Sequence, residues 1–397
     1  MAIPFSILPG SDRSCAWKPY RYLALEGGGV RGIAYGGALE ALDDANVIAG
    51  LQGFAGASAG SMAAALLAAG YSGKETAEVL RNFDFRSLLD GFDISRLVRS
   101  YGLFAGDVME QAIGALLKKK TGHADITFDE LWAITGKELR IASVCMNQAE
   151  LTYFDRHAFG NMSVARAVRA SAAIPVFYTP VEYGKCLYVD GGIMRTLPFD
   201  AFEHLQHVYG GSLLALTLGR GGRDSTVTDV ARFSSFTQFA GHLFSILLGS
   251  ALHTIDTLKS RRTIDMISFN MSIVNPLDFS LCPEAKQFMI AEGYNRTADW
   301  LVKCGHVSES KLKRPPYVAL PPCVFAQHDY APWYLIVWST LVIGLLIAAI
   351  VYRKRLTCRF ADFVAERLDC QALSEEMCRK LEKRLEQRRA DSVKSGQ

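Results

Sequence analysis

The sequence predicts an α/β fold in which helices cover a largely parallel sheet, and three observations lead to this prediction. Short apolar runs alternate with segments rich in Ala and Leu over about the first 220 residues, which is the order typical of strand–helix–strand units. Glycine-rich turns join two of these runs to the segments that follow them. The chain has 397 residues, of which 50% are hydrophobic and 21% charged, so it can bury a large core.

Five apolar runs are the predicted strands, and Ala-rich segments between them are the predicted helices. The runs are YRYLAL, GFAGA, LRIASVC, CLYV and LLALTLG, at residues 20–25, 53–57, 139–145, 186–189 and 213–219. The helices are residues 32–45, 60–70 and 164–173, in which apolar side chains recur at spacings of three and four. A further helix is predicted over residues 233–255, which contain no Asp, Glu, Lys or Arg. We expect it to pack on the domain, with a contact to acyl chains or a membrane surface as the alternative.

The C-terminal part of the chain is predicted to hold a membrane anchor and a tail. Residues 1–314 form the predicted globular domain, and residues 315–332, with five of the thirteen prolines, form a linker. Residues 333–352 are uncharged and mostly apolar, which is enough for a transmembrane helix of about 30 Å with Trp and Tyr near its ends. A buried core helix is the alternative. Residues 353–397 carry 12 Lys and Arg against 8 Asp and Glu and predict a basic, helical tail.

Charge and cysteine content exclude some classes of protein. The formal net charge is +3, from 43 Lys and Arg against 40 Asp and Glu, which is too balanced to indicate a nucleic-acid-binding protein. The nine cysteines include no CxxC pair, so we expect reduced thiols rather than a disulfide scaffold or a zinc ribbon. Reduced thiols favour the cytosolic side of the membrane for the globular domain, whereas the basic residues after Tyr352 favour a cytosolic tail instead. The first fourteen residues lack the pattern of a secretory signal.

The first motif, LALEGGGVRG, leads from a predicted strand into a predicted helix. Its glycines, Gly27, Gly28, Gly29 and Gly32, allow positive φ angles and close backbone approach, so successive N–H groups can converge on one anionic oxygen. Taken alone, the motif leaves three interpretations open. It could be an oxyanion-binding loop, a dinucleotide-binding GxGxxG turn, or a tight strand-to-helix turn.

The second motif, GASAG at residues 56–60, has the pattern GxSxG. It follows an apolar run and precedes an Ala-rich helix, which is the strand–turn–helix context of a nucleophile elbow. The small residues Gly56 and Gly60 permit a sharp turn, and the N-terminus of the helix behind Ser58 favours negative charge on the serine oxygen. The sequence therefore predicts a nucleophilic Ser58, with a role as a helix cap as the alternative.

A serine nucleophile needs a base, and the sequence offers two kinds. Asp190 ends the run CLYV, and the glycines that follow it, Gly191 and Gly192, let a carboxylate project from a strand end. His204 and His207 come next and would give the order Ser, Asp, His of a catalytic triad. Their spacing of three is more typical of paired histidines on the surface of a helix. The sequence shows no cluster with metal-ligand spacing, and a serine mechanism needs neither a metal nor a cofactor.

Taken in order, the motif-bearing blocks resemble the patatin-like phospholipase family. These blocks are EGGGVRG, GASAGS, ARAVRASAAIPVFYTPV at residues 165–181 and YVDGG, and the resemblance covers roughly residues 20–220. It implies a three-layer α/β/α fold with a largely parallel central sheet. It also implies a Ser–Asp dyad that works without histidine on acyl esters of lipids. The run DGGIMRTLP departs from the family in one place, because Thr196 stands where relatives often carry Asn.

The resemblance also assigns roles to individual residues. It implies that Ser58 is the nucleophile, that Asp190 is the base, and that Gly27, Gly28 and Gly29 donate hydrogen bonds to the oxyanion. Arg31 is implied as a structural or phosphate-facing charge. The remaining motif glycines, implied to support the local geometry, are Gly32, Gly56, Gly60, Gly191 and Gly192.

The predicted function is a membrane-anchored serine esterase of the phospholipase A type that releases fatty acid from phospholipid or a related lipid. The expected partners are this lipid and the membrane, with no nucleic acid. A non-catalytic, membrane-tethered protein that keeps the fold to bind lipid or another partner is the alternative. A dinucleotide-dependent oxidoreductase ranks third, because it leaves GxSxG and Asp-Gly-Gly unexplained.

Overall fold

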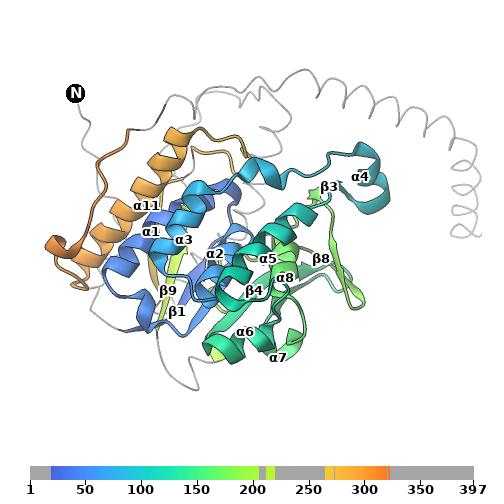
Figure 1. Ribbon diagram of the computed structural model, residues 1–397, viewed down its shortest axis with the longest axis horizontal. Helices are drawn as coiled ribbons and strands as arrows, with labels where there is room; N and C mark the ends of the chain where they lie inside the picture. The colour runs from blue at the N-terminus through green and yellow to red at the C-terminus, as the bar shows by residue number, and fades with distance from the viewer. Residues whose placement is uncertain (1–18, 205–211, 220–263, 272, 320, 322–397) are drawn as a thin grey trace, which may run out of the picture. The chain divides into compact units, whose positions relative to one another are not determined.

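The computed structural model describes residues 19–204, 212–219, 264–271, 273–319 and 321 (Figure 1). The predicted helix 233–255, the predicted transmembrane segment 333–352 and the tail lie outside these residues. Among the described residues, no helix is long and apolar enough to cross a membrane.

An eight-stranded sheet organises the described residues. Its strands run in the order β10-β9-β1-β2-β4-β8-β7, and β5 pairs with β4 beside this path. The pairs between β10 and β4 along this order are parallel, whereas β8 and β5 lie antiparallel to β4, and β7 lies antiparallel to β8. The bounds are β1 Tyr20–Leu25, β2 Gly53–Ala57, β4 Glu138–Cys145, β5 Glu150–Phe154, β7 Val181–Tyr183, β8 Cys186–Asp190, β9 Ser212–Thr217 and β10 Asp265–Ser268.

All five predicted strands are present, as β1, β2, β4, β8 and β9. The predicted largely parallel sheet is confirmed, with the run CLYV as an antiparallel exception. The strands that sequence reasoning missed are β5, β7, β10 and the two-stranded parallel sheet of β3 (Gly102–Phe104) and β6 (Val176–Tyr178). Of these strands, β3, β6 and β7 have only three residues, whereas β5 (ELTYF) and β10 (DMIS) are interrupted by polar residues, so none forms an apolar run that stands out.

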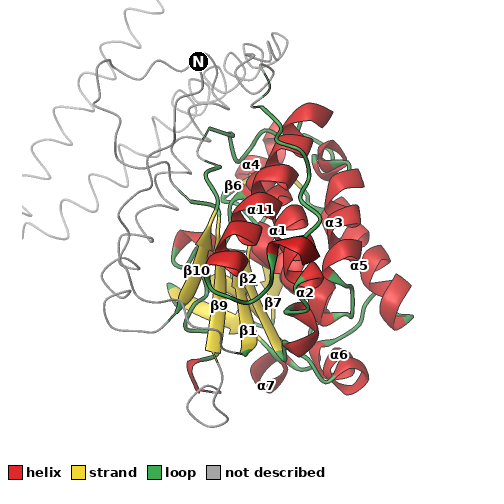
Figure 2. Ribbon diagram, turned by 90° about the vertical axis from the view of Figure 1, so that its left-hand side faces the viewer, coloured by secondary structure: helices red, strands yellow, loops and turns green. Residues whose placement is uncertain are grey.

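Helices cover one face of this sheet (Figure 2). The three predicted helices are α1 (Ala34–Asp44), α2 (Ala59–Ala68) and α8 (Val164–Ser171). The others are α3 (Gly73–Asn82), α4 (Ile94–Ser100), α5 (Asp107–Thr121), α6 (Phe128–Thr135), α7 (Arg156–Phe159) and α11 (Pro283–Lys303). In Figure 2, α1, α2, α3, α5 and α11 lie on the same side of the strands. The described residues that pack on the other face come from a short segment that includes Leu197, Phe199 and Phe202.

Helix α2 lies at the centre of the larger core. Every residue of α2 after Ala59 is buried, and every residue of its preceding strand β2 is buried as well. A helix surrounded on all sides needs small apolar side chains rather than an amphipathic stripe. This explains the run of alanines that follows Ser58.

Helices α1 and α11 approach each other closely through glycine. A Cβ atom built on Gly37 of α1 would lie 1.8 Å from the carbonyl oxygen of Ile290 in α11. A Cβ atom built on Gly293 of α11 would lie 2.0 Å from the carbonyl oxygen of Ala34. Any larger residue at either position would push the two backbones apart, so these glycines set the distance between the helices.

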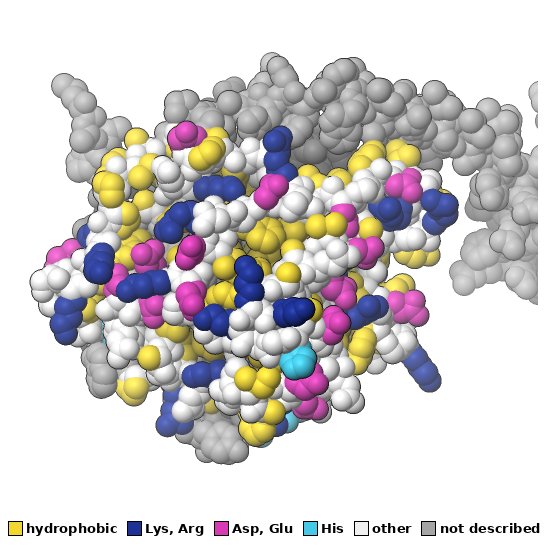
Figure 3. Space-filling model, viewed as in Figure 1, with side chains coloured by type: hydrophobic (Ala, Val, Ile, Leu, Met, Phe, Trp, Pro, Cys, Tyr) yellow, Lys and Arg dark blue, Asp and Glu magenta, His cyan; other side chains and the backbone are white. Residues whose placement is uncertain are grey.

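Charged side chains of both signs are interspersed over the face shown in Figure 3, as the near-zero net charge predicts.

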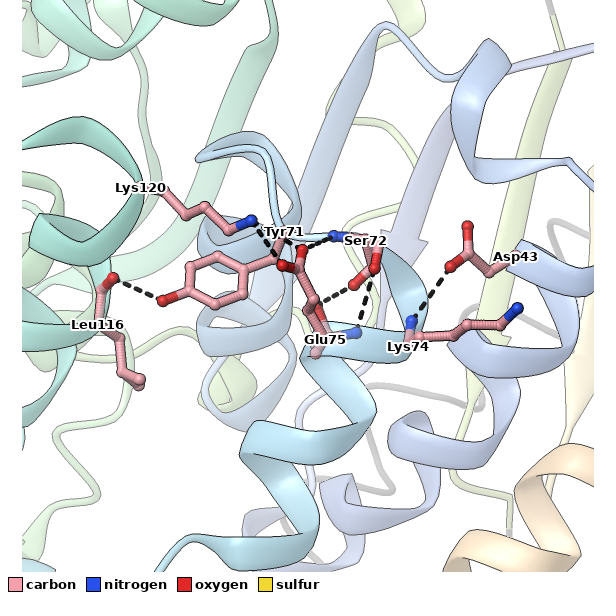
Figure 4. Close-up of polar contacts among 8 residues, drawn as sticks. Asp43, Tyr71, Ser72, Lys74, Glu75, Leu116 and Lys120 are labelled. Carbon is pink, nitrogen blue, oxygen red and sulfur yellow. Dashed lines mark hydrogen bonds and ion pairs between the residues drawn. The ribbon is translucent and has the colours of Figure 1, made fainter.

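One polar cluster fixes the start of α3 (Figure 4). The Ser72 hydroxyl accepts the Glu75 N–H at 3.1 Å, and the Glu75 carboxylate accepts the Ser72 N–H at 2.9 Å, which is a capping box. The same carboxylate accepts a hydrogen bond from the Lys120 ammonium of α5 at 2.7 Å. The Lys74 N–H donates to Asp43 of α1 at 3.2 Å, so the cluster ties α3 to both neighbouring helices.

The cysteines only partly match the prediction of reduced thiols. Cys145 and Cys186 are free thiols. The prediction is wrong for Cys282 and Cys304, which stand at the two ends of α11 and are disulfide-bonded. The 21-residue helix between them is about 30 Å long, so they are not bonded to each other. The spacing of the cysteines follows no recognisable pattern and did not predict these bonds.

Candidate active site

Ser58 lies in a sharp turn between β2 and α2. Its backbone has φ 50° and ψ −123°, a conformation that residues other than glycine rarely adopt. Strain of this kind persists only where the surrounding structure enforces it, and it is the known geometry of a nucleophile elbow. Ser58 is also the residue at which α2 begins, so the positive end of the helix dipole is directed at it.

The glycines of GxSxG are required by close packing of the turn. A Cβ atom built on Gly56 would lie 2.2 Å from the carbonyl oxygen of Gly60. A Cβ atom built on Gly60 would lie 2.3 Å from the carbonyl oxygen of Leu25, at the end of β1. The backbone of Gly60 therefore lies against Gly56 on one side and against the end of β1 on the other. A side chain at Gly56 or at Gly60 would overlap this backbone, so only glycine fits at the two positions.

Asp190 is brought to the same edge of the sheet as Ser58 by strand β4, which lies between them. Ala57, the residue before Ser58, pairs with Ala142 of β4, and Asp190 pairs with Ser143, the next residue of β4. Strands two apart are separated by about 10 Å, which is within reach of two side chains that point toward each other. The β8 strand is antiparallel, yet it ends at the level where the parallel strands end.

The Asp190 side chain is completely buried and only partly hydrogen-bonded. Its Oδ1 atom accepts the N–H of Gly192 at 2.7 Å. Its Oδ2 atom has no hydrogen-bond partner among the described residues. Burial raises the pKa of Asp190 to about 7, and the Gly192 N–H and the Ser58 side chain offset part of that rise. The Ser58 hydroxyl is thus near enough to influence the carboxyl group without being held to it by a short hydrogen bond.

The glycine loop after β1 lies against the nucleophile. A Cβ atom built on Gly27 would lie 3.1 Å from the Cβ atom of Ser58. The N–H of Gly27 donates to the carbonyl oxygen of Thr196 at 2.8 Å, so it is already engaged. Within the described residues, the N–H groups of Gly28 and Gly29 donate no such bond. Of the three N–H groups expected to donate to the oxyanion, those of Gly28 and Gly29 therefore remain as candidates, and that of Gly27 does not.

Thr196 stands where the family resemblance leads us to expect Asn, and its bond to Gly27 is compatible with either residue. The backbone carbonyl oxygen of Thr196 accepts this bond, so the identity of the side chain does not affect it. The hydroxyl of Thr196 is buried and has no partner among the described residues.

Arg31 has a structural role in the described residues. Its Nε atom donates to the carbonyl oxygen of Val274 at 2.7 Å, which ties the glycine loop to the segment after β10. Two further motif glycines lie at close contacts of this region. A Cβ atom on Gly32 would lie 2.9 Å from the Cβ atom of Ala59, and one on Gly191 would lie 2.3 Å from the carbonyl oxygen of Ala142.

The sequence analysis missed three residues that hold the site together. Ser171, at the end of α8, accepts the Ser58 N–H at 2.9 Å and donates to Ala142 at 2.6 Å. The Ser61 hydroxyl donates to the Ser58 carbonyl oxygen at 2.6 Å. The buried Glu26 accepts the N–H of Leu218 at 2.7 Å and so fixes the start of the glycine loop. All three residues stand inside the family blocks quoted above, and that position was the only signal for them.

The histidines do not compete well for the role of base. His204 is exposed, whereas Ser58 and Asp190 are buried, and His207 lies outside the described residues. A search of the described residues for groups of His, Cys, Asp and Glu that could hold a metal ion finds none.

The fold is α/β, and a strained serine stands between a strand and a helix with a glycine loop beside it. This is the arrangement in which serine hydrolases of α/β fold hold their nucleophile. The chain belongs to the patatin-like phospholipase family. The family model described as "Patatin-like phospholipase" matches residues 23–203, which include the glycine loop, Ser58 and Asp190.

Three individual proteins are similar in sequence to this chain. The Bacillus subtilis protein YqhO, described as uncharacterized, is 31% identical over 68% of this chain and 94% of its own length. A "probable lipid hydrolase" of Invertebrate iridescent virus 6 is 29% identical over 48% of this chain and 67% of its own. An uncharacterized mimivirus protein, R571, is 30% identical over 46% of this chain, which spans about three fifths (61%) of that relative.

The fold also has a counterpart among solved structures. VipD from Legionella pneumophila superposes with a TM-score of 0.53 at 16% identity, covering 90% of this chain and 81% of that one. At this identity the likeness shows the fold alone.

Proposed function

We propose that this protein hydrolyses fatty-acyl esters of phospholipids or related lipids through Ser58 and Asp190. The observation that carries the proposal is the pairing of a strained serine at a helix N-terminus with a buried carboxylate at the same sheet edge. One oxygen of that carboxylate lacks a hydrogen-bond partner among the described residues, and the Ser58 side chain influences its pKa. A carboxylate with a pKa near the working pH is suited to accept and return a proton.

The proposed reaction proceeds in two steps. Ser58 Oγ attacks the ester carbonyl while Asp190 takes the hydroxyl proton, and the N–H groups of Gly28 and Gly29 donate to the oxygen that becomes negative. Such donors each stabilise the transition state by about 3 kcal/mol. Asp190 returns the proton to the leaving alcohol, which breaks the ester bond and leaves an acyl group on Ser58. Water, activated by Asp190, then releases the fatty acid and restores Ser58.

We further propose that the enzyme is of the phospholipase A type and acts on a membrane to which residues 333–352 anchor it. The length and lack of charge of this segment support a span. The free thiols of Cys145 and Cys186 favour the cytosolic side for the catalytic domain. The disulfide-bonded Cys282 and Cys304 favour an oxidising compartment, so protection of the domain from added protease in sealed membranes decides between the two sides.

The test is the release of fatty acid from phosphatidylcholine vesicles by the full chain. We expect release by the wild type, a loss of at least about a thousandfold in Ser58→Ala and Asp190→Asn, and no comparable loss in the double variant His204→Ala and His207→Ala. A double histidine variant as inactive as Ser58→Ala would replace the dyad by a triad. Vesicle binding by the wild type without release of fatty acid would favour the non-catalytic alternative.

A further inference from the structure

Five exposed hydrophobic side chains stand in or beside α4, in β6 and in the segment after β10, and the proposed chemistry does not account for them. Among the described residues, ten large hydrophobic side chains are exposed. Half of them come from α4 and the residues beside it, from β6, and from the segment after β10. We call this set the apolar rim, and its members are Phe92, Val98, Tyr101, Val176 and Ile273.

Helix α4 is the most exposed part of the apolar rim. None of its seven residues is buried, and Val98 is 83% exposed on it. Tyr101, the residue after the helix, is 63% exposed. Arg96 and Arg99 stand on either side of Val98 in sequence, and hydrophobic and basic side chains lie next to each other over α4 in Figure 3. A short helix that shows water both apolar and basic side chains is typical of contact with a phospholipid surface.

Val176 is the member of the apolar rim that lies in the two-stranded sheet of β3 and β6. It pairs with Gly102, the residue after Tyr101, and is 53% exposed. Its φ angle is 70°, a conformation that a β-branched residue adopts only when the surroundings impose it. The two strands also pack closely, because a Cβ atom on Gly102 would lie 2.2 Å from the N atom of Thr179. An apolar side chain is thus exposed on a strained residue of this sheet.

The apolar rim is tied to the site through a few residues of one segment. Ser171 accepts the Ser58 N–H, and two residues later the Ala173 carbonyl oxygen accepts the Asp190 N–H at 2.9 Å. Val176 follows Ala173 by three residues, which span at most about 11 Å. Val176 therefore lies close to the backbone that positions Asp190.

A row of aromatic rings continues the apolar rim to the glycine loop. Phe92 contacts Phe104 with ring centroids 5.7 Å apart, Phe104 contacts Phe177 at 4.9 Å, and Phe177 stacks on Phe279 at 5.6 Å. Phe279 belongs to the segment that begins at Ile273 and that packs on the glycine loop. In that segment, the carbonyl oxygen of Pro276 accepts the N–H of Val30 at 3.0 Å.

We propose that the apolar rim is the surface by which this protein contacts a phospholipid bilayer, with Val98 and Tyr101 among the acyl chains and Arg99 near the phosphate groups. The Arg99 side chain is 70% exposed and pairs with Asp93 at 3.3 Å, whereas Arg96 donates to the carbonyl oxygens of Gly91 and Leu103 and so has a structural role. The inference rests on the proposed function, because a lipid ester must pass from the bilayer to Ser58 without its acyl chains crossing water. A surface joined to the site through the segment from Ser171 to Val176 shortens that passage.

Photo-crosslinking tests the contact without relying on catalysis. The full chain carrying Ser58→Ala and p-benzoylphenylalanine at position 101 is placed in vesicles of phosphatidylcholine with a minority of phosphatidylglycerol and irradiated. The control carries the same photoreactive residue at Ile134, which is 56% exposed on α6. We expect lipid adducts at position 101 and few at position 134. Equal yields at both positions, or crosslinks from position 101 to this chain or a second copy of it, would overturn the proposal.

Kinetics separate the apolar rim from the chemistry. For Val98→Asp we expect the rate on vesicle lipid, divided by the rate on a water-soluble short-chain ester, to fall about tenfold, because a charge would replace an inserted apolar side chain. Ile134→Asp should leave this ratio as in the wild type. An unchanged ratio in Val98→Asp contradicts the role of the apolar rim. A wild type that cleaves neither ester contradicts the proposed function, and the crosslinking result then stands alone as the test of the surface.

Discussion

Ser58 and Asp190 each violate a local rule of protein structure. Ser58 adopts a left-handed backbone conformation that costs a non-glycine residue of the order of 1–3 kcal/mol. Asp190 is a carboxylic acid without any exposed surface, and within the described part of the chain its carboxyl group accepts one close hydrogen bond, from the Gly192 N–H. Residues that fold against their own preferences are most often found at functional sites. The structure places both at one sheet edge, where the sequence motifs predicted a reaction.

The buried Asp190 predicts a stability that depends on pH. Its pKa is about 7 in the folded protein against a usual value of 3.8, so between these values the folded state binds more protons than the unfolded state. The free energy of unfolding should therefore fall as the pH rises, by about 2–3 kcal/mol between pH 5 and pH 8 from this group. Asp190→Asn should remove this part of the dependence.

The measurement is urea unfolding of both proteins in detergent solution at a series of pH values, and the difference between them isolates Asp190. Parallel curves for the wild type and Asp190→Asn would mean that the carboxyl group is charged and well solvated at neutral pH, contrary to its burial.

At the scale of elements, α8 holds the nucleophile turn in place through one hydroxyl. In Ser171→Ala the Ser58 N–H loses its acceptor while still buried, which costs about 1–3 kcal/mol. We expect a fall in kcat larger than any rise in KM, because the position of Ser58 changes and the substrate pocket does not.

Ser163, at the other end of α8, is the matched control. Its hydroxyl is buried and has no partner among the described residues, so Ser163→Ala removes no hydrogen bond seen there. Equal loss of stability and kcat in the two variants would show that α8 tolerates neither change and that Ser171 has no special role.

The contact of α1 with α11 makes a second prediction at this scale. Gly37→Ala places a methyl group where backbone already lies, and should lower the free energy of unfolding by about 3 kcal/mol. Gly36→Ala, one residue earlier, meets its nearest atom at an ordinary 3.5 Å and should be neutral or stabilise α1 by about 0.5–1 kcal/mol. Denaturation curves that rank the two variants in the opposite order would contradict the close approach of the helices.

At the scale of the whole molecule, the sequence predicted most of what local pattern can encode. The five predicted apolar runs form strands, and the turn at Ser58 forms because Gly56 and Gly60 permit it. Contacts between distant segments were beyond such reasoning. The bond from Ser58 to Ser171 joins residues 113 apart in sequence, and the engagement of the Gly27 N–H depends on where Thr196 lies in space. Neither contact can be predicted from the spacing of residues along the chain.

The anchor is a prediction for the whole chain. The full-length protein should remain with membranes in alkaline carbonate, because residues 333–352 have the length and lack of charge of a span. A chain ending near Val324 should be released and should still cleave a water-soluble ester, since the dyad and the glycine loop precede the linker. Release of the full-length protein by carbonate would show that the segment is no anchor, and loss of folding on truncation would indicate a core helix.

The central claim, that Ser58 is a nucleophile activated by Asp190, is tested most directly by labelling with a fluorophosphonate followed by peptide mapping. We predict that Ser58 is the labelled residue and that the labelling rate rises with pH through about 7, as Asp190 loses its proton. Asp190→Asn should label slower by about 10²–10⁴-fold, and the double histidine variant should label as fast as the wild type. Labelling at another residue, or an Asp190→Asn variant that labels at the wild-type rate, would contradict the account.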